Sequence, residues 1–235
     1  MPHSLLGGRS RLRPRPIRAL AAAATLAVIV SGCAASFDSS ELRAARRPIG
    51  ALGAGFVDPL APPPPEGMIK PKPGSWDAVR PPRGYRVVLL TAGHDRATTT
   101  LVTAVRQWAK AEHLRLETVA VTEPDVFVDG IVQAMDRGPD LVICAGHALV
   151  GALALVTASH LDQQFLVVGA QLPEPTVNVT AAVWRGASSR GAEVPDTASS
   201  FDPEAFTPDQ AGAAIRAGVA SVLSDLTGIV IWLGP

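Results

Sequence analysis

The sequence predicts an α/β fold for residues 85–235: a single doubly wound, mostly parallel sheet with helices on both faces. Short apolar segments that lack alternation recur along this region, and stretches with helical spacing separate them. Strands buried on both faces have this continuous apolar character, which is typical of parallel sheets covered by helices. Right-handed crossovers between such strands build a doubly wound sheet.

The first half of this region contains three expected strands, at residues 86–90, 116–121 and 141–144. An expected helix over 97–113 places three apolar side chains on one face: Leu101, Val105 and Trp108. A second helix, over 126–135, is indicated by apolar residues at every fourth position: Phe127, Ile131 and Met135. Strands and helices therefore alternate from the start of the domain.

The alternation continues to the end of the chain. A helix is expected over 149–160, and the remaining apolar runs predict strands at 165–168, 177–183 and 229–233. The polar segment 196–208 is expected to be a surface loop. The last helix covers 208–223, and Pro208 suits its first turn because a backbone N–H is not needed there.

The first 33 residues have the features of a lipoprotein export signal. The first 18 residues contain five arginines and no acidic residue, and an apolar run follows over residues 19–30. This run is shorter than the roughly 20 residues of a membrane-spanning helix. The segment Val30-Ser31-Gly32-Cys33 then resembles a lipobox, at which bacterial lipoproteins are lipidated on the cysteine and cleaved before it. We expect a lipid (palmitate) on Cys33 to hold the protein at the extracytoplasmic side of the cell membrane; the alternative is an ordinary cleavage site with a chance cysteine.

Composition excludes several classes of partner and site. The leader holds five of the 21 basic residues, so the rest of the chain has 16 basic and 21 acidic residues, a net charge of −5. This balance disfavours nucleic acid as a partner. Cys144 is the only cysteine besides Cys33, and it lies in an apolar run where it is expected to behave as a small hydrophobe. No disulfide or cysteine-based zinc site is expected within one chain.

Residues 34–84 are expected to form a proline-rich tether. The stretch contains Pro62-Pro63-Pro64-Pro65 and a Lys-Pro alternation at 70–73, with no sustained apolar period. Proline at this density favours extended polyproline backbone and disfavours helices and sheet ladders. Such a tether is semi-rigid and would hold the domain away from the membrane. An alternative is that residues 49–57 pack on the domain as a strap.

The loops that follow the strands are the expected ligand site. In doubly wound sheets, ligands bind beyond the carboxyl ends of the strands, where the strand order reverses. If the first five strands follow the order 2-1-3-4-5, the two Ala-Gly-His loops that end in His94 and His147 flank this position. A glycine before each histidine lets the backbone turn tightly. The expected ligand-binding residues, all from loops after strands, are His94, Asp95, His147, Gln171, Trp184 and Arg185.

Each of these residues also has a structural interpretation. Asp95 could orient an imidazole or accept a ligand hydroxyl, and Thr98 or Thr99 is expected to be the helix N-cap. His147 could satisfy a loop carbonyl, and Trp184 could be a hydrophobic plug instead of a stacking platform. Arg185 and Arg190 could be solvated side chains.

Catalysis has little support in the sequence. We find no nucleophile-elbow motif, no glycine loop followed by Lys-Ser or Lys-Thr, and no helix-borne His-Glu pair. We therefore expect no catalytic residues, no cofactor and no metal. A metal-dependent enzyme that uses His94, Asp95 and His147 is the weakest of our hypotheses.

Residues 139–191 resemble the basic membrane protein family, the substrate-binding lipoproteins of ABC transporters. The similarity lies in Pro139-Asp140-Leu141-Val142-Ile143, in Gly146-His147-Ala148-Leu149, in the strand at 164–168, and in the strand and small-residue turn over 178–191. The resemblance implies one lobe of a type 1 periplasmic-binding-protein fold, a nucleoside-like ligand and a transporter partner.

The chain also departs from that family. Members of that family usually carry an aspartate after the first strand and a Ser-Phe-Asn-Gln-like segment at the start of the first helix. They also usually carry an aspartate at the end of the fourth strand. Here residues 92–100 contain no Phe or Asn, and Gly169-Ala170-Gln171 follows the fourth strand. The length leaves room for one lobe only, which would leave a ligand partly exposed.

Two hypotheses for function remain close. In the first, the protein is a tethered binding module for a small polar ligand, or for a partner that supplies the missing lobe, including a second copy. In the second, it is a structural or interaction lipoprotein that kept the fold and lost the ligand.

Overall fold

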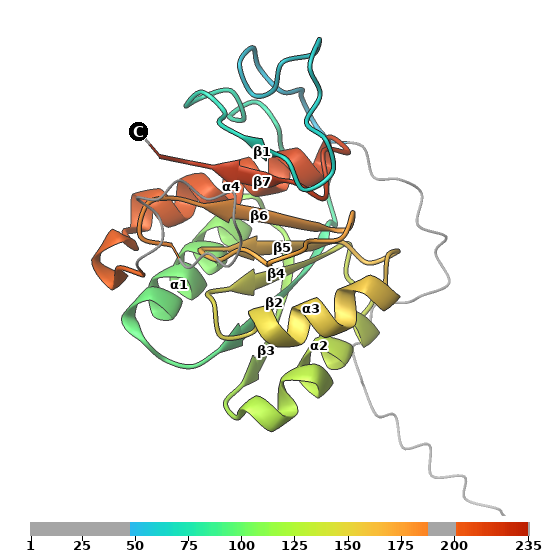
Figure 1. Ribbon diagram of the computed structural model, residues 1–235, viewed down its shortest axis with the longest axis vertical. Coiled ribbons are helices and arrows are strands. Elements are labelled where there is room, and N and C mark those ends of the chain that lie inside the picture. Colours follow the sequence, from blue (N-terminus) through green and yellow to red (C-terminus); the bar gives the residue numbers. More distant parts are fainter. Residues whose placement is uncertain (1–47, 188–200, 235) are drawn as a thin grey trace, which may run out of the picture. The chain divides into compact units, whose positions relative to one another are not determined.

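The computed structural model describes residues 48–187 and 201–234 (Figure 1). Within these residues the chain forms one seven-stranded sheet in the order β1-β7-β6-β5-β4-β2-β3, and every pairing between neighbouring strands is parallel. The strands are β1 (Met68–Ile69), β2 (Arg86–Ala92), β3 (Arg115–Val121), β4 (Leu141–Ala145), β5 (Phe165–Val168), β6 (Val179–Val183) and β7 (Val230–Trp232). The predicted fold class and the reversal of strand order at β2 are confirmed.

Two pairs of helices cover the two faces of the sheet (Figure 1). Helices α1 (Arg96–Ala111) and α4 (Pro208–Leu223) contact each other on one face. Helices α2 (Phe127–Asp136) and α3 (Val150–Val156) contact each other on the opposite face, and a 3-10 turn (Thr157–Ser159) extends α3. The periodicities over 97–113, 126–135 and 208–223 therefore predicted real helices, with ends shifted by at most two residues.

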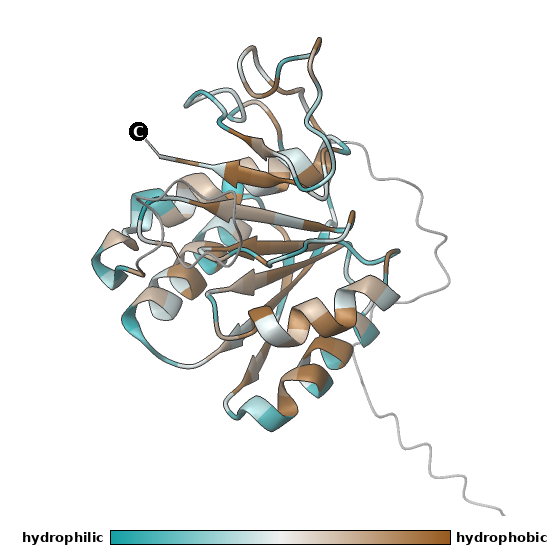
Figure 2. Ribbon diagram, viewed as in Figure 1, coloured by the Kyte–Doolittle hydropathy of each residue, from teal (hydrophilic) through white to brown (hydrophobic). Residues whose placement is uncertain are grey.

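Alternation along the strands produces a core on each face. Val87 and Leu89 of β2 belong to the cluster under α1 and α4, whereas Val88 and Leu90 belong to the cluster under α2 and α3. All four side chains are fully buried. Figure 2 shows apolar residues along the central strands. The continuous apolar runs arise because both faces of each central strand are covered.

Residues 48–84 pack on the domain and are not a solvated tether. Phe56, Trp76 and Val79 are 1%, 5% and 8% exposed and belong to the core cluster on the α1–α4 side. Met68 pairs with Val230, so β1 extends the sheet at its β7 edge. We call residues 48–84 the strap. Proline stopped regular secondary structure here, as expected, but the scattered apolar side chains between the prolines still bury themselves.

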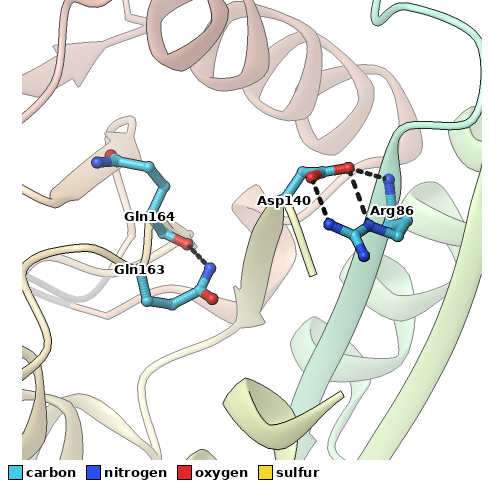
Figure 3. Close-up of polar contacts among 4 residues, drawn as sticks. All are labelled: Arg86, Asp140, Gln163 and Gln164. Atoms are coloured by element: carbon cyan, nitrogen blue, oxygen red, sulfur yellow. Dashed lines mark hydrogen bonds and ion pairs between the residues drawn. The ribbon is translucent and has the colours of Figure 1, made fainter. Parts of the chain in front are cut away.

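Buried polar contacts join elements at the amino edge of the sheet, where the strands begin. The carboxylate of Asp140 accepts from the guanidinium of Arg86 at 3.0 Å and from its backbone N–H at 2.8 Å, which links the starts of β2 and β4 (Figure 3). The ion pair of Arg86 and Asp140 is largely buried, with side chains 12% and 10% exposed. The side chain of Gln163 donates to the carbonyl oxygen of the next residue, Gln164 (Figure 3).

Asn178, directly before β6, is fully buried and joins a second set of elements at this edge. Its side-chain nitrogen lies 3.2, 2.9 and 3.0 Å from the carbonyl oxygens of Thr157, His160 and Gln163. Its side-chain oxygen accepts from the Thr176 hydroxyl at 2.6 Å. One amide thus fixes the end of α3 and the approach to β6.

The expected export signal (1–33) and the first part of the expected tether (34–47) lie outside the described residues. Within the described part of the chain, no helix is long and apolar enough to cross a membrane.

Candidate functional site

The carboxyl edge of the sheet carries the loops in which the sequence places a ligand. The loops after β2, β4, β5 and β6 meet at this edge because all these strands are parallel and adjacent. Each loop contains a glycine with left-handed backbone: Gly93 (φ 82°), Gly146 (87°), Gly169 (78°) and Gly186 (87°). The tight turns predicted at the two Ala-Gly-His loops are confirmed.

Asp95 is the N-cap of α1. Its carboxylate accepts from the backbone N–H of Thr98 at 3.0 Å and from the Thr98 hydroxyl at 2.6 Å. The prediction that Thr98 or Thr99 caps this helix is wrong, because Thr98 is the donor and is itself buried. Partial burial raises the pKa of Asp95, but the hydrogen bonds from Thr98 outweigh it and leave the pKa lowered. Asp95 is therefore a charged capping residue.

His94 and His147 follow the adjacent strands β2 and β4, and both are exposed. The loop after β4 packs against the first turn of α1, since a Cβ added at Gly146 would lie 3.1 Å from the Thr98 hydroxyl oxygen. The His147 ring packs on Phe201, with centroids 4.9 Å apart. The structure thus places the two histidines on neighbouring loops of one edge.

Trp184 is a plug. It is 3% exposed, its indole N–H donates to the carbonyl oxygen of Ala205 at 3.0 Å, and its ring packs edge-on against Phe206 at 5.0 Å. Phe206 also covers the end of β5, because a Cβ added at Gly169 would lie 2.6 Å from the Phe206 ring. Of the two interpretations of Trp184, the structure therefore agrees with the plug and leaves no exposed face for stacking.

The segment 201–206 lies across the carboxyl edge, from the ends of β5 and β6 to the loop after β4 and the start of α1. Phe201 packs on Phe206 at 5.5 Å, so an aromatic row runs from Trp184 through Phe206 and Phe201 to His147. Glu204 pairs with Arg96 at the start of α1. Segment 196–208 was expected to be a surface loop, and residues 201–204 and 207 are indeed exposed, but Phe206 is buried against this edge. Sequence reasoning missed the two phenylalanines; their signal is that they are large apolar residues in a polar stretch.

Two buried oxygen atoms near this edge have no hydrogen-bond partner among the described residues. Thr91, next to the last residue of β2, is 7% exposed, and its hydroxyl oxygen is unpaired. Gln171, which follows β5, is 6% exposed, and its side-chain oxygen is unpaired. A buried polar group without a partner costs roughly 1–3 kcal/mol, so each atom is a candidate ligand contact.

The other polar residues predicted at this edge have separate outcomes. Arg185, directly after Trp184, is exposed, and no described residue pairs with its side chain. Arg190 lies outside the described residues. Among residues 48–187 and 201–234, no group of three or more His, Cys, Asp or Glu side chains could hold a metal ion. Cys144 is fully buried, and burial raises the pKa of its thiol far above the ordinary value, so a thiolate does not form there.

Comparisons with known proteins describe fold only. No family model matches the chain, and no curated protein matches it. A Peptoclostridium difficile 630 chain described as a lipoprotein fragment superposes at 13% identity and TM-score 0.42, over 59% of this chain and 98% of that one. An ABC transporter solute-binding protein from Aeropyrum pernix K1 does so at 12% identity and TM-score 0.39, over 63% and 47% of the two chains. One from Conexibacter woesei DSM 14684 is 20% identical, with TM-score 0.35 over 42% and 35%. This chain spans about half or less of those two solute-binding proteins.

Proposed function

We propose that this protein is a lipid-anchored, extracytoplasmic binding module whose single α/β lobe recognises a small polar ligand at its carboxyl edge. The observation that carries the proposal is the collection of polar groups there without partners among the described residues. These groups are the buried oxygens of Thr91 and Gln171 and the exposed side chains of His94 and Arg185. Asp95 shapes the edge by fixing α1, and Trp184 is its apolar wall.

The ligand position follows from the part of the edge that segment 201–206 leaves open. Phe206 and Trp184 fill the space over β5 and β6, and Phe201 packs on the His147 ring, whereas both histidines keep exposed surface beside the ends of β2 and β4. A ligand seated there would contact the histidines at the ends of β2 and β4, with Thr91 one residue before the end of β2. Nothing in the sheet supplies a second lobe, so we expect modest affinity, in the micromolar to millimolar range.

Anchoring rests on the leader of the sequence. The leader has the three parts of a lipoprotein signal in the usual order: arginines, a short apolar run, and Ser31-Gly32-Cys33. Since residues 48–84 pack on the domain, they do not serve as a spacer between Cys33 and the folded domain. Incorporation of labelled palmitate, lost in Cys33→Ser, tests the anchor; labelling that persists in that variant would contradict it.

The second candidate function is that of a structural or interaction lipoprotein that binds no small ligand. The plug of Trp184 and Phe206 favours it, because these rings occupy space that a ligand would otherwise fill. In this candidate function the filled carboxyl edge would bind a partner protein, a transporter subunit or a second copy.

Ligand screening separates the two candidates. Residues 48–234 contain the whole sheet and both core clusters, so the chain from Ala34 onward carries its own core. Its thermal unfolding is measured with nucleosides, sugars and amino acids. The proposal predicts a stabilising shift that is lost in His94→Ala and His147→Ala and retained in His113→Asn, a matched control at the far end of α1. No shift with any ligand, together with a stable dimer in light scattering, would favour the interaction protein.

A further inference from the structure

A cavity of about 700 Å³ opens at the amino edge of the sheet, opposite the edge discussed above. Four segments form its walls: the proline run of the strap, the end of α3, the loop that enters β6 and the loop that enters β7. The residues that matter are Pro63–Pro65, Glu66, Leu161, Glu174, Pro175 and Val177. Its volume falls within the roughly 300–1,000 Å³ of small-molecule sites.

The walls of this cavity are fixed by hydrogen bonds. Gly67 donates to Pro64 at 2.9 Å, and Glu66 donates its backbone N–H to the carbonyl oxygen of Gly228 at 2.8 Å, so the strap turn is held against the loop before β7. Asn178 holds the opposite wall through the carbonyls that end α3. The cavity is therefore preformed, which lowers the entropy cost of binding.

Apolar side chains stay exposed around this cavity. Leu161 and Val177 are 52% and 58% exposed, and prolines line both sides. Glu66 also adopts a left-handed backbone, with φ 64°, which is costly for a residue with a Cβ. Strain of this kind persists where the surroundings impose it, and ligand sites are a common place for it.

The charge of the cavity has one sign. Glu66 and Glu174 are its only charged lining residues among those described, and neither has an ion-pair partner there. An apolar, proline-lined space with two carboxylates complements an apolar body that carries a positive charge.

We propose that this amino-edge cavity binds a small organic ammonium ion with an apolar body. Its body would pack on the prolines, Leu161 and Val177, while the ammonium group faces Glu66 and Glu174. This site is separate from the carboxyl edge, so it stands or falls independently of the function proposed above.

Titration with three matched probes tests the charge preference. Phenethylamine, 2-phenylethanol and 3-phenylpropionate share a ring and differ in charge at neutral pH. Each is added to the chain from Ala34 onward, and backbone amide shifts are followed by NMR. We expect phenethylamine to perturb amides at Thr176, Val177 and Gly228, and to bind at least about threefold more tightly than the alcohol, as two partly exposed carboxylates allow. The anion should bind most weakly.

Variants identify the groups responsible. Glu66→Gln with Glu174→Gln should reduce the affinity for the amine to that for the alcohol, whereas Glu123→Gln, an exposed carboxylate elsewhere, should change nothing. Val177→Lys should abolish amine binding, and its unchanged amide spectrum elsewhere would show that the fold is intact. Equal binding of the amine and the anion, or amide shifts scattered away from the cavity, would overturn the proposal.

Discussion

The side-chain nitrogen of Asn178 lies 2.9 Å from the carbonyl oxygen of His160, and Asn178 itself is fully buried. The same nitrogen contacts two more carbonyl oxygens, and an amide has only two N–H groups, so the donors are shared. This one side chain therefore joins the end of α3 to the segment that enters β6.

Replacing Asn178 should therefore destabilise the domain strongly. Asn178→Leu keeps the size but removes the donor to three carbonyl oxygens, of which those of Thr157 and His160 keep a backbone N–H donor. Because the Gln163 carbonyl and the Thr176 hydroxyl lose their Asn178 contact, we expect a loss of roughly 2–5 kcal/mol in the free energy of unfolding. Thr176→Val removes one hydroxyl donor and should cost about 1 kcal/mol. Urea denaturation measures both. A smaller cost for Asn178→Leu than for Thr176→Val would contradict this role.

The buried pair of Arg86 and Asp140 should show strong coupling. Each single change, Arg86→Met or Asp140→Leu, leaves a charge largely buried, so we expect each to cost roughly 3 kcal/mol and the double variant to cost much less than their sum. The more exposed pair of Arg80 and Glu112 is the control and should couple by under about 1 kcal/mol. Costs for Arg86 and Asp140 that simply add, within about 0.5 kcal/mol, would show that the pair does not join β2 to β4.

Capping by Asp95 should depend on pH. The folded-state pKa lies below the ordinary value of 3.8, so the charged carboxylate stabilises the fold above that value, and this contribution is lost as pH falls through the folded-state pKa. Asp95→Ala should cost about 1 kcal/mol at pH 7 and progressively less in acid below pH 3.8.

A neutral cap supplies the comparison. Thr207 caps α4 through its hydroxyl, which accepts from the Gln210 N–H at 3.2 Å. Thr207→Ala should therefore cost a similar free energy of unfolding at neutral pH and in acid. If the cost of Asp95→Ala were equally constant, the charge of Asp95 would not contribute to the cap.

Packing of the strap predicts a large effect of Phe56. Its ring is 1% exposed and meets Trp76 edge-on at 6.4 Å. Phe56→Ala should lower the free energy of unfolding by roughly 3–5 kcal/mol, whereas Leu60→Ala, at a residue 94% exposed, should change it by less than about 0.5 kcal/mol. Equal effects would mean that residues 48–84 are a solvated tether after all.

These contacts show which parts of the fold could be predicted from sequence. Strands β2, β4 and β5 are recognisable because all of their side chains except that of Arg86 are buried, which leaves a run of consecutive apolar residues in each. The strap was predicted only as an alternative, over residues 49–57, because Phe56 and Trp76 stand alone between prolines, with neither a helical nor a strand period. Tertiary packing alone decides that such residues are buried.

The candidate site could be predicted in part. Parallel strands and glycine turns place His94 and His147 at one edge, as the strand order implies. The capping role of Asp95 depends on where α1 begins, which periodicity locates only to within a residue or two. Phe206 reaches Trp184 from 22 positions further along the chain, and no local pattern encodes such a contact.

Backbone amide mapping tests the central claim most directly. The polar ligand that most stabilises the chain in the thermal screen is titrated into it, and amide shifts are followed by NMR. Binding at the carboxyl edge predicts perturbations concentrated at Gly93, His94, Gly146, His147 and Gln171. Perturbations that leave these amides unchanged and cluster elsewhere would contradict the proposed site.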